Sequence, residues 1–171
     1  MAVTPTPATS PCPTADAAAL RKAPAEREAA WLGLLQVHAD LTRGLDAELL
    51  SKVGLSLSAV DVLTRIAFSE AGVMRISEIA TSTLLSQSRI SRLAAELERR
   101  GLLERRPCPG DSRVVNVAIT DAGRTLLSRA LDVYWDGVDR QLLDRLTEGQ
   151  IDELGRIWAK ALGPRAEGCP T

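Results

Sequence analysis

SQSRISRLAAELERRG at residues 86–101, followed by LLERRPCPGDSRVVNVAIT at residues 102–120, is the stretch that decides the fold. The first part predicts an α-helix, because its apolar residues recur three and four positions apart and so share one face. These residues are Ile90, Leu93, Ala94 and Leu97. The second part predicts two antiparallel strands at residues 102–106 and 114–119, with the Pro-Cys-Pro-Gly-Asp-Ser segment as the tip of a hairpin.

A short helix precedes this stretch and completes a helix-turn-helix. We expect Ser77 to cap a helix that runs to about Ser82, and residues 83–85 to form the turn. In such a motif the second helix enters the DNA major groove with its N-terminal end while its back packs on a core. The candidates for reading DNA are therefore the polar side chains of its first turns: Ser86, Gln87, Ser88, Arg89, Ser91 and Arg92. Ser86 could instead only cap its own helix, and the arginines could pair with Glu96.

Charge is unevenly distributed along the chain. The whole sequence has 21 basic and 22 acidic residues, for a net charge of −1. Residues 86–113 hold seven arginines and four acidic residues, a balance of +3, so the remainder carries −4. A basic segment on an acidic body is an electrostatic footprint for nucleic acid. Arginine is the basic residue used throughout this segment, and its planar fork fits guanine edges and phosphates, although a GC-rich coding sequence would also favour it.

The flanking segments divide the chain into five predicted parts. Residues 1–24, with five prolines, predict a disordered arm rather than a signal peptide. Residues 25–57 predict a long dimerisation helix, and residues 58–120 the DNA-binding domain, with Ser58 as a helix N-cap and a short edge strand at residues 74–76. Residues 121–163 predict two helices, the first capped by Thr120 and reaching about Arg145, the second starting at Thr147. Residues 164–171 predict a flexible tail.

The helices at the two chain ends have wide apolar faces that a winged helix-turn-helix is too small to cover. We expect them to pack against the same helices of a second copy and form a two-fold homodimer. Such a dimer sets two arginine-bearing helices one helical turn apart on a palindromic site in double-stranded DNA. The predicted fold class is mainly α with a small β-hairpin wing: a winged helix-turn-helix plus dimerisation helices from both chain ends.

Other classes of protein need residues that this sequence does not provide. One histidine, no glycine-rich phosphate loop and no serine elbow argue against an enzyme. Three widely separated cysteines, Cys12, Cys108 and Cys169, argue against a zinc site or a disulfide framework, so we expect no metal and no cofactor. No apolar run approaches the length of a membrane span, and we expect a cytoplasmic protein.

With these elements placed, the chain resembles the MarR (multiple antibiotic resistance regulator) family of bacterial transcription factors over residues 30–162. The matching segments are ISEIA at 76–80, LSQSRISRLAAELERRGLLERR at 85–106, DSR at 111–113 and AITDAGR at 118–124. The resemblance implies a triangular homodimer that represses neighbouring genes. It also implies release from DNA when a small molecule binds between the dimerisation helices and the DNA-binding lobe. Activation instead of repression stays open.

The resemblance also assigns the wing. Arg113 matches the position that reaches into the minor groove, where narrow A·T-rich stretches concentrate negative potential. Asp111 is well placed to orient it through a charge-assisted pair, with a solvated hairpin salt bridge as the plainer alternative. Arg105 and Arg106, where the hairpin leaves the helix, could contact phosphates or face solvent.

In the family the ligand site is lined by the first two helices, which here carry three candidate side chains. Trp31, His38 and Asp61 could offer an aromatic wall, a titratable ring and a buried carboxylate to a small aromatic or amphipathic ligand. Each has a plainer interpretation: Trp31 as packing, His38 as a hydrogen-bonded core residue, and Asp61 as a favourable charge near a helix start. His38 at the dimer axis or in the ligand site would instead make DNA binding sensitive to pH.

Two further alternatives stay open. Cys108 lies beside Arg105 and Arg106, whose charge favours the reactive thiolate, so oxidation there could disturb DNA contact. Family members that sense peroxides carry a cysteine early in the first helix, and this chain has none there. A winged helix that binds protein instead of DNA is the other alternative, against which the arginine-rich helix and Arg113 argue.

Overall fold

The structure is a computed structural model, and it describes residues 24–69, 72–83, 85–107 and 115–163. Packing divides the chain into two units, residues 1–38 and residues 39–171. The described part of the first unit, residues 24–38, is almost entirely helical and has no buried side chain. It belongs to helix α2, Ala25–Val53, which ends inside the second unit.

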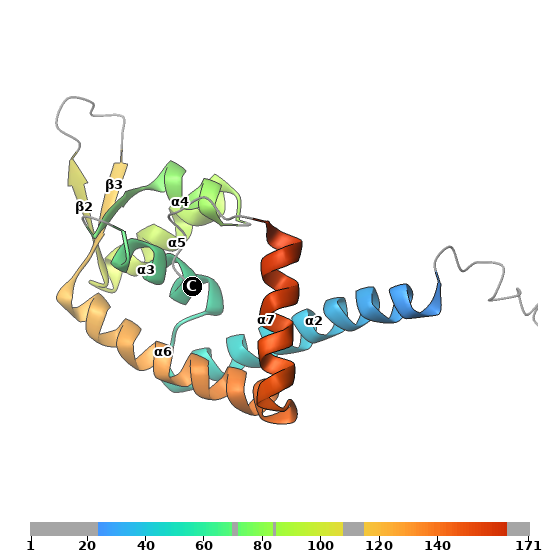
Figure 1. The fold of residues 1–171 in the computed structure, drawn as a ribbon. Coiled ribbons are helices and arrows are strands. Elements are labelled where there is room, and N and C mark those ends of the chain that lie inside the picture. Colours follow the sequence, from blue (N-terminus) through green and yellow to red (C-terminus); the bar gives the residue numbers. More distant parts are fainter. Residues whose placement is uncertain (1–23, 70–71, 84, 108–114, 164–171) are drawn as a thin grey trace, which may run out of the picture. The chain divides into compact units, whose positions relative to one another are not determined.

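The second unit is mainly helical with one small sheet, which confirms the predicted fold class (Figure 1). After α2 its elements are α3 (Leu57–Ala67), β1 (Val73–Arg75), α4 (Ile76–Ser82), α5 (Gln87–Arg99), β2 (Leu103–Pro107), β3 (Val115–Ile119), α6 (Asp121–Gln141), a 3-10 turn (Leu143–Arg145) and α7 (Glu148–Leu162). The three strands are antiparallel in the order β1-β3-β2. The predicted hairpin is thus widened by the short edge strand β1, whose bounds lie one residue earlier than predicted.

Two predicted caps are each wrong by two residues: α3 is capped at residue 56 and α4 at residue 75. Ser56, not Ser58, caps α3: its hydroxyl accepts a hydrogen bond from the Ala59 N–H at 3.2 Å. The carboxylate of Asp46 accepts from the Leu57 N–H at 2.7 Å, so a long-range contact also fixes this start. Caps fall where the first backbone N–H groups find acceptors, and a tertiary acceptor is invisible in local sequence.

Helix α4 begins at Ile76, one residue before the predicted cap Ser77. The carboxylate of Glu78 accepts from the Arg75 N–H at 2.9 Å, which satisfies one orphan donor at this end. Helix α6 ends at Gln141 rather than near Arg145, because Leu142 leaves helical geometry with φ −132°. The predicted caps Thr120 and Thr147 are confirmed, with Thr120 accepting from the Gly123 N–H at 3.0 Å.

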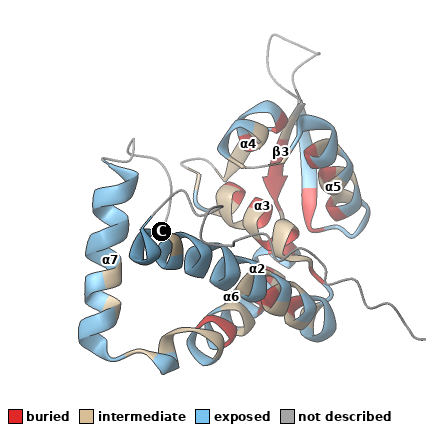
Figure 2. Cartoon of the chain, turned by 90° about the vertical axis from the view of Figure 1, so that its right-hand side faces the viewer, coloured by how far each residue is buried: buried red, intermediate tan, exposed pale blue. Residues whose placement is uncertain are grey.

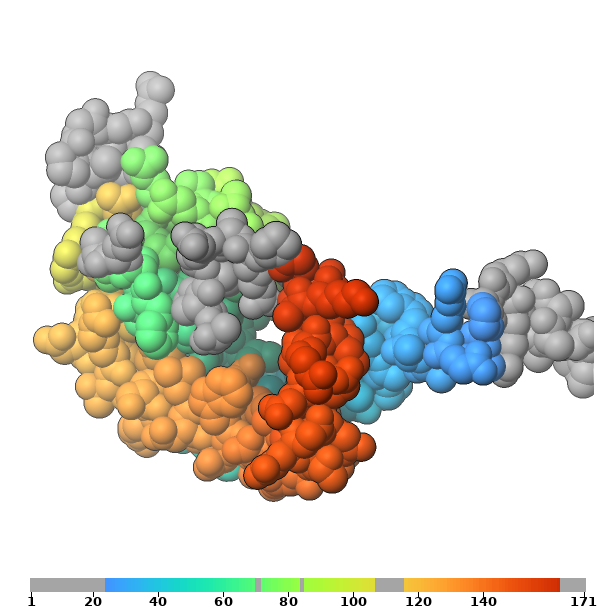
Figure 3. Space-filling view, viewed as in Figure 1, coloured from blue at the N-terminus to red at the C-terminus, as the bar shows by residue number. Residues whose placement is uncertain are grey.

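The hydrophobic core lies where α3, α4 and α5 face the sheet, with the end of α2 and the start of α6 packed beside them (Figure 2). Its largest fully buried side chains are Leu49, Leu55, Val62, Leu63, Ile66, Ile79, Ile90, Leu97 and Val117. In the space-filling view α6 runs along the surface of this unit as an orange band (Figure 3). Within the described ranges, no helix is both long and apolar enough to cross a membrane.

Candidate nucleic-acid interface

Helix α5 divides sharply into a buried back and an exposed front. Ile90, Ala94 and Leu97 on the back are no more than 1 % exposed. The polar front consists of residues that are exposed in the structure: Ser86, Gln87, Ser88, Arg89 and Arg92. Ser91, also a predicted DNA contact, is half-buried. The buried back holds the helix on the core, so the front is presented to solvent as a fixed surface.

The N-terminal end of α5 is capped by Ser86, as the structural alternative predicted. Its hydroxyl accepts from the Arg89 N–H at 3.4 Å and lies 3.2 Å from the hydroxyl of Ser88. The first turn holds no acidic residue, whereas α4, α6 and α7 each carry one there. The partial positive charge of this helix end is therefore left to attract an external anion such as a phosphate.

Arg89 and Arg92 both lie on this exposed front. In the part of the chain that the structure describes, neither guanidinium forms an ion pair, so the predicted alternative pairing with Glu96 is not observed. Arg92 donates through Nε to the backbone oxygen of Ser88 at 3.4 Å. Two guanidinium groups three residues apart thus lie beside the partial positive charge of the helix N-terminus.

The arginines at the base of the wing, which comprises β2, β3 and the loop between them, are held differently. Arg105 lies 2.8 Å from the Glu98 carboxylate, and Arg106 lies 2.8 Å from that of Glu104. All four side chains are between one third and slightly over one half exposed. Both arginines are therefore ion-paired but accessible to solvent. Exposed ion pairs contribute little to stability, so each arginine can exchange its carboxylate for another anion at little cost.

Sequence reasoning missed a third arginine at this base. Arg75 in β1 and Arg106 in β2 both pair with Asn116 of β3, so the three residues form one row across the sheet. Residues directly opposite each other in neighbouring strands project from the same face. The exposed Arg75 thus lies on the same face as Arg106, with Asn116 between them, and forms an ion pair with Glu78 at 3.8 Å. Only the strand register reveals this, because the two residues are far apart in sequence.

The predicted wing-tip residues Asp111 and Arg113, and the candidate redox residue Cys108, lie outside the described residues. Their predicted roles stay predictions.

The predicted ligand residues belong to different units. Trp31, 59 % exposed, and His38, also exposed, lie in residues 24–38, so neither is a core residue of the single chain. Asp61 lies in α3 of the second unit and pairs with Arg65 at 2.9 Å. Its side chain is 43 % exposed, so the expectation of a buried carboxylate is wrong. The plainer interpretation is also wrong, because Asp61 is not in the first turn of α3.

Asp61 has a second neighbour on α6. Burial of the phenol raises the pKa of Tyr134, and the negative charge of Asp61 raises it further. Tyr134 packs edge-on against Trp135, with ring centroids 5.4 Å apart. Within the described residues, no group of three or more His, Cys, Asp or Glu side chains is arranged to hold a metal ion.

Comparison with known proteins agrees with this geometry. The profile of the MarR family matches residues 53–114. The chain is 32 % identical over 131 residues to the HTH-type transcriptional repressor IacR of Pseudomonas putida, which covers 74 % of this chain and 72 % of that protein.

Two solved structures from Streptomyces coelicolor are similar over almost their whole length. Sco3205, a MarR family transcriptional regulator crystallised in complex with DNA, has a TM-score of 0.72 and 31 % identity, covering 88 % of this chain and 96 % of that one. AbsC, another MarR family transcriptional regulator, has a TM-score of 0.72 and 27 % identity, covering 83 % and 95 %.

Proposed function

Because this chain belongs to the MarR family of transcriptional regulators, we propose that it binds a palindromic operator as a homodimer and represses neighbouring genes. The family consists of DNA-binding regulators and not of enzymes, as the sequence predicted. The similar protein IacR is itself a repressor, which supports repression over activation here. Membership of a family of DNA-binding regulators argues against the alternative of a winged helix that binds protein instead of DNA.

One observation carries the proposed DNA contacts: the front of α5 is exposed and cationic, and its arginines pair with no acid among the described residues, while its back is fully buried. Arg89 and Arg92 reach base edges or phosphates in the major groove, with Gln87 and Ser88 beside them. Ser86 and Ser91 contact the DNA backbone, and Arg105 and Arg106 exchange their carboxylate partners for phosphates. Arg113, oriented by Asp111, enters the minor groove.

The proposed homodimer is supported by apolar side chains that the single chain leaves exposed. In residues 24–38 these are Trp31, Leu32, Leu34, Leu35 and Val37, each 37–59 % exposed. Helix α7 has no buried residue, and Ile157, Trp158 and Leu162 are 37–58 % exposed. Exposed apolar surface on this scale in a soluble regulator is typical of a subunit interface. On this proposal residues 25–57 and 121–163 are the dimerisation segments, and residues 58–120 bind DNA.

The proposed effector is a small aromatic or amphipathic molecule that lowers operator affinity. Support comes from the family resemblance, with the exposed ring of Trp31 as an apolar contact for such a molecule. A panel of aromatic acids added to the operator complex tests this. Release by one of them in wild type, with weaker release from Trp31→Ala, supports a role for Trp31 in effector binding.

The main experiment uses the full chain and a pool of randomised DNA duplexes. Light scattering gives the mass in solution, selection from the pool gives the bound sequence, and footprinting on the upstream region of its own gene gives the natural site. We expect a dimer that enriches an inverted repeat with half-sites about 10 base pairs apart. A monomer, or a pool without enrichment, would contradict the proposal.

A further inference from the structure

Helices α2 and α6 cross closely where both belong to the second unit. Leu45 of α2 and Val138 of α6 are buried at 2 % and 8 % exposure. Gly137 is buried opposite Leu45, and a Cβ at this glycine would lie 2.6 Å from the Leu45 Cδ2 atom. A larger residue would force the Leu45 side chain to shift, so the glycine favours close contact at this crossing.

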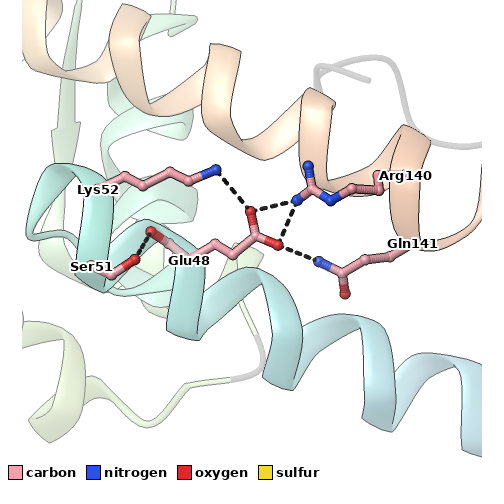
Figure 4. Close-up of polar contacts among 5 residues, drawn as sticks. All are labelled: Glu48, Ser51, Lys52, Arg140 and Gln141. Carbon is pink, nitrogen blue, oxygen red and sulfur yellow. Dashed lines mark hydrogen bonds and ion pairs between the residues drawn. The ribbon is translucent and has the colours of Figure 1, made fainter.

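A polar cluster closes the same crossing, and we name it the Glu48 clasp (Figure 4). The Nη2 atom of Arg140 lies 2.6 Å from both carboxylate oxygens of Glu48. Gln141 donates to one of these oxygens at 2.9 Å, and Lys52 donates to the other at 3.2 Å. The Glu48 side chain is only 25 % exposed, and its carboxylate is shared among three donors from two helices. These donors lower the pKa of Glu48, with the hydrogen bond from Arg140 as the largest cause.

The other end of α6 is fixed to the C-terminal end of α5. The hydroxyl of Thr120, the cap of α6, donates to the Gly101 carbonyl at 2.7 Å, and its N–H donates to the Leu102 carbonyl at 3.1 Å. A Cβ at Gly123 would collide with that same Leu102 carbonyl. The end of α5 and the start of α6 are therefore in direct backbone contact.

A third contact joins α5 to the end of α2. Arg100, directly after α5, donates through Nη1 to the Gly54 carbonyl at 2.9 Å. Gly54 directly follows the last residue of α2, so this hydrogen bond places the guanidinium at the negative end of the α2 dipole. Three joints now connect three helices in a closed triangle: α5 with α2, α5 with α6, and α6 with α2 through the Glu48 clasp.

We propose that Glu48, Arg140 and Gln141 are positioning residues for operator recognition: the clasp fixes α6 against α2 and so sets the direction of α5. This inference rests on the proposed dimer, in which α2 connects the lobe to the subunit interface. The apolar contact between Leu45 and Val138 holds the helices together but is non-directional. Charge-assisted hydrogen bonds depend on direction, so the clasp selects one crossing angle.

The spacing between the two half-sites of the operator can be used to test this crossing angle. One added base pair between two half-sites turns one of them by about 35°, since a turn of duplex holds about 10 base pairs. When all three contacts among α2, α5 and α6 are intact, α5 cannot turn to match the rotated half-site unless one contact breaks. When the Glu48 clasp is removed, α5 can turn with the half-site.

The test compares two duplexes built from the selected operator: the operator itself and a copy with one extra base pair between the half-sites. The ratio of the two affinities measures how strictly the dimer demands its spacing. In Glu48→Ala and in Arg140→Ala we expect this ratio to fall roughly fivefold, and the double variant to fall no further, because the two residues share one contact. The matched control is Asp132→Ala, an exposed acid on α6 outside the clasp, and its ratio should equal that of wild type.

Each result decides between outcomes. A ratio unchanged in both alanine variants, even with a lower unfolding temperature, would make the clasp a merely structural contact and overturn the inference. If an alanine variant does not fold, Glu48→Gln, which keeps the shape and removes the charge, is measured in its place and interpreted in the same way. A wild-type chain that is monomeric or enriches no duplex would instead remove the proposed function, and this inference with it.

Discussion

Arg89 on α5 and Arg140 on α6 bear the same guanidinium group in opposite surroundings. Arg140 is engaged by a carboxylate of another helix, in a cluster that also includes Gln141 and Lys52. Arg89 is exposed at the start of a helix whose first turn contains no acid. A shared carboxylate that bridges two helices makes Arg140 part of the scaffold, whereas Arg89 forms no ion pair with a described residue and stays available to DNA. For these two arginines the position of nearby carboxylates therefore separates the two roles.

The largest expected effect tests whether the two faces of α5 are separable. Ile90→Ala removes a fully buried side chain from the back of α5. We expect it to lower the free energy of unfolding by about 2–5 kcal/mol through lost burial and the cavity left behind. Urea denaturation measures this, with the exposed front substitution Gln87→Ala as the control. Equal stability of the two variants would show that the back does not anchor the helix.

The second prediction concerns the front alone. Arg89→Ala should weaken operator binding by about 1–3 kcal/mol, because a cation that contacts a base edge or phosphate is lost. Its unfolding midpoint should stay close to that of wild type, since the side chain is exposed and forms no ion pair with a described residue. Gel-shift titration at fixed salt measures the affinity. Arg99→Ala, at the other end of the same helix, is the matched control, and equal losses in both variants would contradict a specific role for Arg89.

A third prediction distinguishes a phosphate contact from a base contact at Arg92. Removal of one phosphate contact should reduce the slope of log affinity against log salt concentration by about 1. Fluorescence anisotropy of Arg92→Ala over a salt series gives this slope. A changed sequence preference with an unaltered slope would assign Arg92 to base readout instead.

The smallest expected effect concerns the pH dependence of the contact between Glu48 and Arg140. The pKa of Glu48 is lowered from its ordinary 4.5 in the folded chain. Its contribution to stability is therefore fully present above pH 4.5 and is lost as the pH falls through the lowered value. The unfolding temperature of Glu48→Gln should lie below that of wild type at neutral pH, and the difference should shrink in acid. A difference that stays constant across the pH series would mean that the Glu48 charge does not stabilise the fold.

The elements with strong local signals could be predicted from sequence. The apolar spacing in α5 and the alternation on either side of the wing loop encode structures that form from neighbouring residues. The caps Thr120 and Thr147 were also readable, because a capping side chain lies within three residues of the N–H it accepts from. The start of α3 was not, since the Asp46 carboxylate that helps to fix it comes from another helix.

The site divides in the same way. The exposed polar front of α5 follows from the helical period once the apolar face is known. The ion pairs of Arg105 and Arg106 depend on which carboxylates the hairpin brings near, and the row of Arg75, Asn116 and Arg106 depends on strand register. Glu48 and Arg140 are 92 residues apart and carry no periodic signal. Contacts of this kind arise only when the helices have packed.

Helix α7 begins with reciprocal hydrogen bonds between Thr147 and Gln150, yet none of its residues is buried within one chain. A short helix with no buried residue is marginal in water, however well its ends are capped. In the proposed homodimer its persistence should therefore obey mass action: dilution loosens it, and association with a second subunit restores it. A cell that makes little of this regulator would then hold it partly frayed and open to proteolysis, so that its own abundance limits how long each copy survives.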